Sequence, residues 1–136
     1  MIIGTPKEIK NHEYRVGLTP ESAGELATSG HEVLVEDGAG LGIGSNNDDY
    51  VARGAHIVES AGELFERADM VVKVKEPQAQ ERAMLRKDQL LFTYLHLAAD
   101  EPQTKDLLAS GVIAIAYETV TDRSGGLPLL LSLIHI

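Results

Sequence analysis

Three short, mainly apolar runs constrain the fold of this chain more than any other feature of its sequence. They lie at residues 70–74, 89–93 and 112–116. Their length and apolar character are typical of strands buried inside a sheet. Helical segments at 77–85 and 101–110 separate them, and Gly111 ends the second. Buried strands that alternate with helices predict an α/β, doubly wound fold with a mainly parallel sheet.

The first half of the chain repeats this alternation. A helix begins where Thr19 can cap it, with Pro20 at its first position, and it ends at Gly30. We therefore expect a parallel sheet with helices on both faces throughout. The elements expected before residue 69 are strands at 2–4, 31–36 and 56–59 and helices at 20–30, 48–54 and 60–67.

Composition excludes several classes of protein. The 136 residues carry a net charge of −9, and no cluster of Lys and Arg is present for contact with nucleic acid. The absence of Cys excludes disulfides and thiolate metal sites. The N-terminus lacks the order of a signal peptide, and no apolar run reaches the ~20 residues that span a bilayer. We expect a single soluble, cytoplasmic domain that does not bind nucleic acid or membrane.

A glycine-rich stretch, DGAGLGIG at 37–44, follows a predicted strand. A dinucleotide site needs G-x-G-x-x-G leading directly into a helix, so that backbone amides face the pyrophosphate. Here the sixth position is Ile43 or Ser45, depending on the starting glycine, and a polar SNNDD stretch follows. The stretch predicts a loop with unusual backbone angles, and we expect no cofactor-binding residues in this chain.

Three residues, Arg15, Lys75 and His96, each follow a different predicted strand. Carboxyl ends of parallel strands meet at one edge of a sheet, where α/β proteins bind ligands. Arginine can bind a carboxylate through two parallel N–H donors, lysine supplies a mobile cation and histidine transfers protons near neutral pH. Each residue alone also has a structural interpretation as a solvated arginine, a strand-terminal lysine or a packed histidine. Together they predict a site for a small amino or 2-oxo acid.

Other kinds of site are not supported. Glu8 with His12, and His96 with Asp100, lie four residues apart, but neither pair has a third ligand, so we predict no metal. No serine lies on a G-x-S-x-G turn.

The last six residues, LSLIHI at 131–136, carry no charge, cap or helix signal. The same six letters result from translating a common sequencing adapter. We expect residues 1–130 to be the natural domain and residues 131–136 to be an adapter-derived tail, so His135 is not a candidate site residue. The alternative is a natural apolar strand end.

Five stretches closely resemble the N-terminal half of bacterial alanine dehydrogenases: IGTPKEIKNHEYRVGLTP, GHEVLVEDGAGLG, ADMVVKVKEP, LLFTYLHLAAD and IAYETV. The resemblance spans residues 1 to about 130. It implies that Arg15 clamps the substrate carboxylate, that Lys75 binds substrate and that His96 is the catalytic acid and base. It also implies oxidation of L-alanine to pyruvate and ammonium by NAD.

The same resemblance implies a truncation. In that family NAD and a second catalytic group, an aspartate, belong to a C-terminal domain that this chain does not include. We therefore expect the fragment alone to be inactive and the full-length enzyme to be a homohexamer.

Two alternatives remain. The first is the α-subunit of proton-translocating NAD(P) transhydrogenase, which resembles this chain at its start but typically lacks the equivalents of Lys75 and His96. The second is a stand-alone module that binds a small amino or 2-oxo acid.

Overall fold

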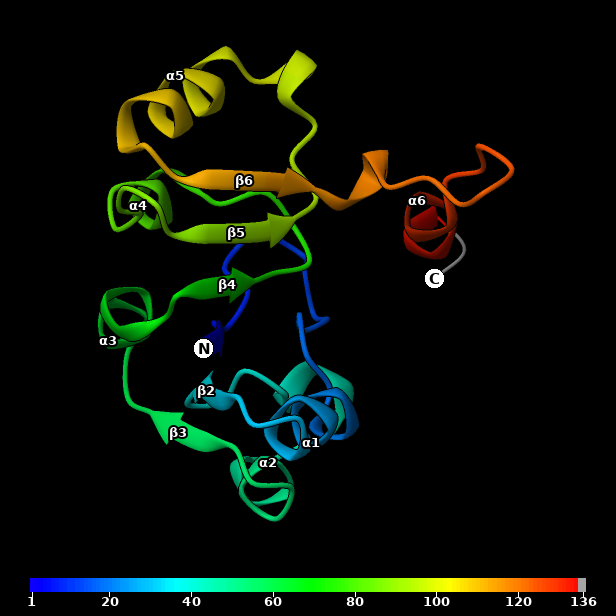
Figure 1. Ribbon diagram of the computed structural model, residues 1–136. Coiled ribbons are helices and arrows are strands. Elements are labelled where there is room, and N and C mark those ends of the chain that lie inside the picture. Colours follow the sequence, from blue (N-terminus) through cyan, green and yellow to red (C-terminus); the bar gives the residue numbers. More distant parts are fainter. Residues whose placement is uncertain (135–136) are drawn as a thin grey trace.

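The computed structural model describes residues 1–134 and contains one six-stranded sheet (Figure 1). All neighbouring strands pair in parallel, in the order β3-β2-β1-β4-β5-β6. The strands are β1 (Ile2–Thr5), β2 (Glu32–Glu36), β3 (His56–Val58), β4 (Met70–Val72), β5 (Leu90–Thr93) and β6 (Ile113–Ala116). The predicted doubly wound, parallel α/β fold is confirmed.

Helices connect successive strands. The α-helices are α1 (Pro20–Thr28), α2 (Asn47–Val51), α3 (Ala61–Arg67), α4 (Ala79–Arg82), α5 (Glu101–Ser110) and α6 (Pro128–Ile134), with 3-10 turns η1 (Leu41–Ile43), η2 (Leu97–Ala99) and η3 (Tyr117–Thr119). The predicted caps are present, because Thr19 accepts a hydrogen bond from the Ser22 amide and Gly111 ends α5 at φ 72°. No helix in residues 1–134 is long and apolar enough to cross a membrane.

Two hydrophobic cores lie on opposite faces of the sheet. The crossovers that contain α1 and α2 run along the sheet from β1 toward β3. The crossovers that contain α3, α4 and α5 run in the opposite direction, toward β6. Because such crossovers are right-handed, the two groups cover different faces. Neighbouring residues of β2 show this: Val33 packs in a cluster with Ala23 of α1, whereas Leu34 packs in a cluster with Leu64 of α3.

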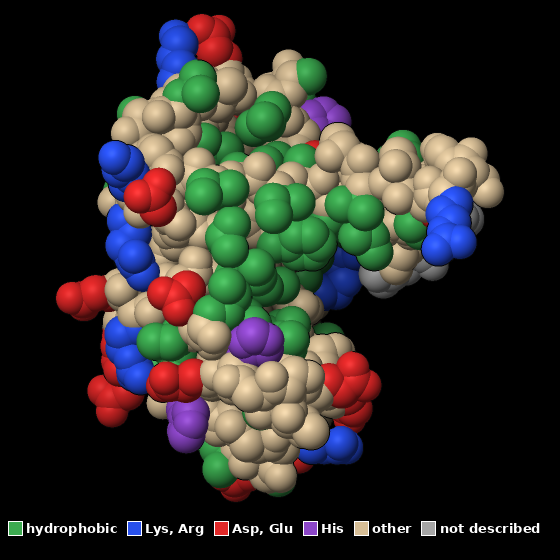
Figure 2. All heavy atoms as spheres, viewed as in Figure 1, with side chains coloured by type: hydrophobic (Ala, Val, Ile, Leu, Met, Phe, Trp, Pro, Cys, Tyr) green, Lys and Arg blue, Asp and Glu red, His purple; other side chains and the backbone are tan. Residues whose placement is uncertain are grey.

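The prediction that 112–116 is a buried strand is wrong. In β6, Ile113 and Ile115 are 50% and 38% exposed. They pair in register with Leu90 and Phe92 of β5, so these four side chains share one face. On that face α1 and α2 cover only the half of the sheet formed by β1, β2 and β3, and β6 is an edge strand. Hydrophobic side chains consequently gather on the surface where β5 and β6 lie (Figure 2).

Residues 131–134 are helical, although their sequence contains no helix signal. Helix α6 includes Leu131 to Ile134 and stands apart from the sheet (Figure 1). Leu131 is half exposed, whereas Leu133 is partly buried. Residues 135 and 136 lie outside the described residues. The domain boundary at 130 and the foreign origin of the tail stay predictions.

Candidate functional site

Arg15 lies in the loop between β1 and α1, where an internal carboxylate already holds it. Its Nε and Nη2 donate to the two oxygens of Glu13 at 2.8 and 2.6 Å. These hydrogen bonds from Arg15 lower the pKa of Glu13, and the carboxylate in turn raises the pKa of the guanidinium. The Nη1 edge makes no hydrogen bond or ion pair to the described residues. One edge of Arg15 is therefore oriented by Glu13, and the other remains for a second acceptor.

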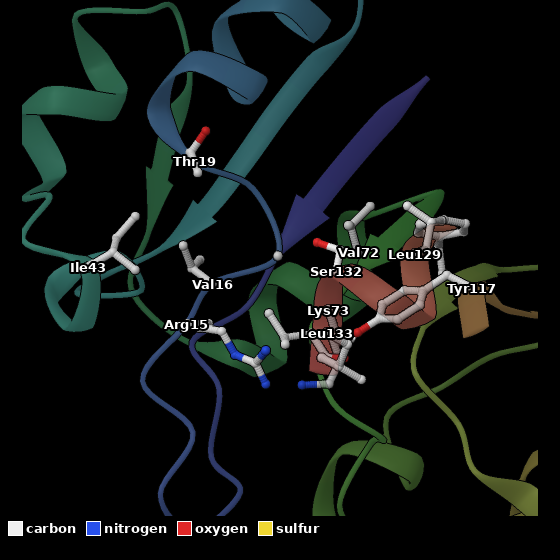
Figure 3. Close-up of a pocket in the computed structure, with 13 residues that line it drawn as sticks. Arg15, Val16, Thr19, Ile43, Val72, Lys73, Tyr117, Leu129, Ser132 and Leu133 are labelled. Carbon is white, nitrogen blue, oxygen red and sulfur yellow. Dashed lines mark hydrogen bonds between the residues drawn. The ribbon is translucent and has the colours of Figure 1, made fainter. Parts of the chain in front are cut away.

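A cavity of about 360 Å³ lies beside Arg15. Figure 3 shows Arg15, Lys73 and Tyr117 converging on it, with Leu129 and Leu133 of α6 on its wall. Burial raises the pKa of Tyr117 to about 12, and its hydroxyl donates to the Val74 carbonyl at 2.6 Å. The phenol therefore stays neutral at physiological pH and fixes the backbone just before Lys75.

Lys73 is fully buried and held between two carboxylates. Its Nζ lies 2.5 Å from Glu8 and 3.0 Å from Glu81. The other oxygen of Glu8 accepts hydrogen bonds from the amides of Val74 and Lys75. Burial raises the pKa of Glu8, because the loss of contact with water disfavours the charged carboxylate. Lys73 is thus committed to this cluster, which fixes the strand end that carries Lys75.

Lys75 and His96 line a second cavity, also of about 360 Å³, on either side of Tyr94. The Lys75 Nζ lies 4.6 Å from the centre of the Tyr94 ring. The Tyr94 hydroxyl lies 2.5 Å from His96 Nδ1. Within residues 1–134, Lys75 Nζ has no hydrogen bond or ion pair, so its ammonium remains available to a ligand. The three side chains form one connected unit of cation, phenol and imidazole.

The backbone places His96 in an unusual conformation. It has φ 48° and ψ 48°, in the left-handed region that residues other than glycine rarely adopt. Its amide and that of Leu95 donate to the Glu118 carboxylate at 3.0 and 3.1 Å. Glu118 lies after β6, so a neighbouring strand end holds the turn.

The three predicted site residues are therefore distributed over two cavities. Lys75 and His96 share one, and Arg15 lines the other. The cavities have no lining residue in common, but consecutive residues, Val74 and Lys75, line one each. Electrostatics link the two groups, because the charges of both Arg15 and Lys75 lower the pKa of Glu13.

Sequence reasoning missed the residues that orient these groups. Glu13 and Tyr94 each precede a predicted site residue by two positions, and this short spacing was an available signal. Glu8 and Glu118 lie more than twenty residues from the amides they bind. No local pattern reveals such pairs.

The glycine-rich loop packs against the Arg15 loop. A Cβ on Gly42 would lie 2.0 Å from the Tyr14 carbonyl, so only glycine permits this approach. The helix that follows, α2, caps its own amides with Asn46 and Asp49. Residues 37–49 therefore form a loop and a self-capped helix start, and not a pyrophosphate cradle. Residues 1–134 also contain no group of three His, Asp or Glu side chains that could hold a metal ion.

Comparisons with known proteins show the family of this chain. A family model described as "Alanine dehydrogenase/PNT, N-terminal domain" matches residues 4–136. The alanine dehydrogenase of Halomonas elongata is 55% identical over 130 residues, which are 96% of this chain and 35% of the relative. The alanine dehydrogenase of Bacillus subtilis is 52% identical, over 96% of this chain and 34% of the relative.

Solved structures of two related proteins superpose on this chain. An L-alanine dehydrogenase structure superposes with a TM-score of 0.92 at 54% identity, over 96% of this chain and 36% of that one. A transhydrogenase from Sinorhizobium meliloti superposes with a TM-score of 0.82 at 28% identity, over 90% and 36%. The chain spans about a third of the length of the relatives it matches.

Proposed function

Because this chain belongs to the alanine dehydrogenase/PNT N-terminal domain family, we propose that it is the substrate-binding portion of an NAD-dependent L-alanine dehydrogenase. The observation that carries the proposal is the unit of Lys75, Tyr94 and His96 in one cavity, with the free edge of Arg15 at the other cavity. A cation, a proton carrier and a carboxylate fork are the groups that interconversion of an amino acid and a 2-oxo acid requires.

The residues have separate roles in this proposal. The free edge of Arg15 binds the substrate carboxylate, and Glu13 keeps the guanidinium plane oriented. Lys75 places a positive charge where the substrate oxygen becomes more negative. His96 moves a proton to and from that oxygen, and the Tyr94 hydroxyl orients the imidazole through Nδ1.

NAD, the oxidant in the reaction, would be bound by the part of the relatives that extends beyond this match. When bound, NAD accepts a hydride from the substrate carbon. The glycine-rich loop does not form a pyrophosphate cradle, so we assign the residues of this chain to substrate binding and proton transfer. In this proposal the chain alone does not turn over, and the full-length protein is a cytoplasmic homohexamer.

The two alternatives make different predictions. A transhydrogenase component would not need Lys75 and His96, and the solved transhydrogenase is 28% identical against 54% for the alanine dehydrogenase. A free-standing binding module would bind pyruvate tightly without any further domain.

The decisive experiment joins residues 1–130 to the matching remainder of the Halomonas elongata enzyme. Alanine-dependent reduction of NAD should appear in this chimera. A His96→Ala version should lose roughly 10²–10⁴-fold in kcat, the usual contribution of a general acid–base group. A folded chimera without activity, or a His96→Ala chimera with near-normal turnover across the pH range, would contradict the proposal. Pyruvate binding by residues 1–130 alone, measured by calorimetry, would support the binding module.

A further inference from the structure

The side chain of Lys75 is held differently from that of Arg15. The Arg15 guanidinium is oriented by two hydrogen bonds to the Glu13 carboxylate. The Lys75 ammonium lies 4.6 Å from the centre of the Tyr94 ring and has no hydrogen bond or ion pair to the described residues. Its position therefore depends on how the backbone beneath it is fixed.

That backbone is bound at each polar group of residues 74 and 75. The Val74 carbonyl accepts a hydrogen bond from the Tyr117 hydroxyl at 2.6 Å. The Lys75 carbonyl accepts one from the Thr93 hydroxyl at 2.8 Å. Both amides donate to a single atom, Oε1 of Glu8, which is their only acceptor in the described part of the chain. One carboxylate oxygen therefore fixes the amide side of this segment.

The hydrogen-bond partners of the Glu8 carboxylate are all donors. Oε2 lies 2.5 Å from the Lys73 ammonium, and Oε1 faces the two amides. The Glu8 side chain is only 2% exposed, so its partners come from the protein. Burial raises the pKa of Glu8, and the Lys73 charge and these hydrogen bonds oppose that rise. A proton on either oxygen would meet only donors, so the arrangement requires the ionised carboxylate.

The charge of Lys73 does not by itself require Glu8. Glu81 lies 3.0 Å from the same ammonium, and its side chain is equally buried. An additional buried charge costs free energy unless hydrogen bonds compensate for it. The other oxygen of Glu81 caps the start of its own helix, α4, whereas that of Glu8 binds the amides of residues 74 and 75. These amides account for the second carboxylate.

Glu8 also belongs to the loop between β1 and α1, which carries Arg15. Both residues line one small cavity of about 80 Å³. The pKa of Arg15 is raised first by its hydrogen bond to Glu13 and further by the charge of Glu8. The Glu8 carboxylate therefore joins the loop that carries the arginine to the segment that carries Lys75.

We propose that Glu8 is a positioning residue, which sets the place of the Lys75 ammonium relative to Arg15 during the reaction. The inference rests on the proposed function and adds a residue that does not touch the substrate. Glu8 acts through backbone amides, so its replacement leaves the Arg15 and Lys75 side chains chemically intact. Any kinetic defect should therefore disappear when residue 75 has no ammonium to position.

The kinetic test uses two variants of the full-length enzyme, each of which removes one carboxylate from beside Lys73. Glu8→Gln turns an NH2 group toward either Lys73 or the two amides. We expect kcat for alanine oxidation to fall about tenfold, the rate equivalent of one hydrogen bond to a charged group. Glu81→Gln is the matched control, because it weakens the same ion cluster but leaves the amides with their acceptor. Its kcat should equal that of the wild type.

A double-mutant cycle separates positioning from general support of the fold. In a Lys75→Ala enzyme, Glu8→Gln should cause no further loss of kcat. Losses that multiply in the double variant would overturn the proposal, and so would equal losses in Glu8→Gln and Glu81→Gln. Glu8→Asp keeps the charge but is one methylene shorter, so it cannot reach Lys73 and the amides together. It should repeat the loss if Glu8→Gln does not fold, and a normal kcat in either variant would refute the role.

Hydrogen exchange of the amides of Val74 and Lys75 gives a measurement without turnover. Both amides should exchange slowly in the wild type and in Glu81→Gln, and faster in Glu8→Gln. Unchanged protection in Glu8→Gln would contradict the contact on which the proposal depends. Faster exchange with a normal kcat would contradict the positioning role alone. A wild-type protein with protected amides but no alanine dehydrogenase activity would instead contradict the proposed function.

Discussion

The carboxylate of Glu118 accepts hydrogen bonds from the backbone amides of Leu95 and His96 and so holds His96 in a left-handed turn. A non-glycine residue in this region costs roughly 1–3 kcal/mol, and surrounding contacts must offset the strain. The turn aims the imidazole back at the Tyr94 hydroxyl. We infer that Glu118 is a positioning residue for His96.

Replacing Glu118 should therefore change catalysis through His96. Glu118→Ala should lower kcat by roughly 10–100-fold, the rate equivalent of a strain of that size. Glu118→Gln keeps one acceptor oxygen and should have a smaller effect. The pH profile of kcat should shift as well, because the orientation of His96 toward Tyr94 is lost. Glu101→Gln, on the exposed start of α5, is the control, and equal effects on kcat in both mutants would refute this role.

Arg15→Lys should weaken substrate binding although it keeps the charge. Lysine cannot bind Glu13 with one edge and a substrate carboxylate with the other. KM for alanine and for pyruvate should rise roughly 10–100-fold, the effect of losing a charge-assisted hydrogen bond. Unaltered KM values in steady-state kinetics would show that Arg15 does not contact the carboxylate.

Lys75→Ala should depress both rate and affinity. The ammonium over the Tyr94 ring is the cation available to polarise the reacting oxygen. Loss of such a group lowers kcat by roughly 10²–10³-fold in other enzymes. Lys105→Ala, an exposed lysine of α5, should leave both constants unchanged. A Lys75→Ala enzyme with normal kcat would restrict Lys75 to binding.

The pair of Glu13 and Arg15 should make stability depend on pH. Its hydrogen bonds lower the pKa of Glu13 in the folded protein, so the pair stabilises the fold fully above the ordinary pKa of a glutamate. This contribution is lost as the pH falls through the lowered value. Urea unfolding should show Glu13→Gln to be less stable than wild type at neutral pH, with the difference shrinking toward acid. A difference that stays constant with pH would argue against the linkage.

Gly17→Ala should destabilise the loop that carries Arg15. A Cβ at Gly17 would lie 2.4 Å from the Val72 carbonyl, and neither backbone segment can move away easily. We expect a loss of roughly 1–3 kcal/mol, typical of overpacking in a core. Gly62→Ala is the control, because its Cβ would meet only Ser60 Oγ at 3.9 Å and should favour helix α3. Melting temperatures of the two mutants should move in opposite directions.

The sequence alone determined the class of fold. Apolar runs such as 70–74 and 89–93, separated by capped helices, are local signals, and local signals suffice for strands and helices in alternation. The candidate residues could also be chosen from sequence, since the segments after predicted strands that carry Arg15, Lys75 or His96 are local features. Burial of 112–116 could not be predicted, because it depends on which helices cover each face of the finished sheet.

The tertiary structure decided how the candidate residues are held. Glu8 meets the amide of Lys75 across 67 positions of sequence, and Glu118 meets His96 across 22. Only the order of strands in the sheet brings such pairs together. The fold also pairs Lys73 with Glu8 and Glu81 in a buried ion cluster. Lys75 stays available to a ligand, although the two lysines look equivalent in VVKVKEP. Sequence identifies the groups that could react, and the distances set by the sheet determine which of them can.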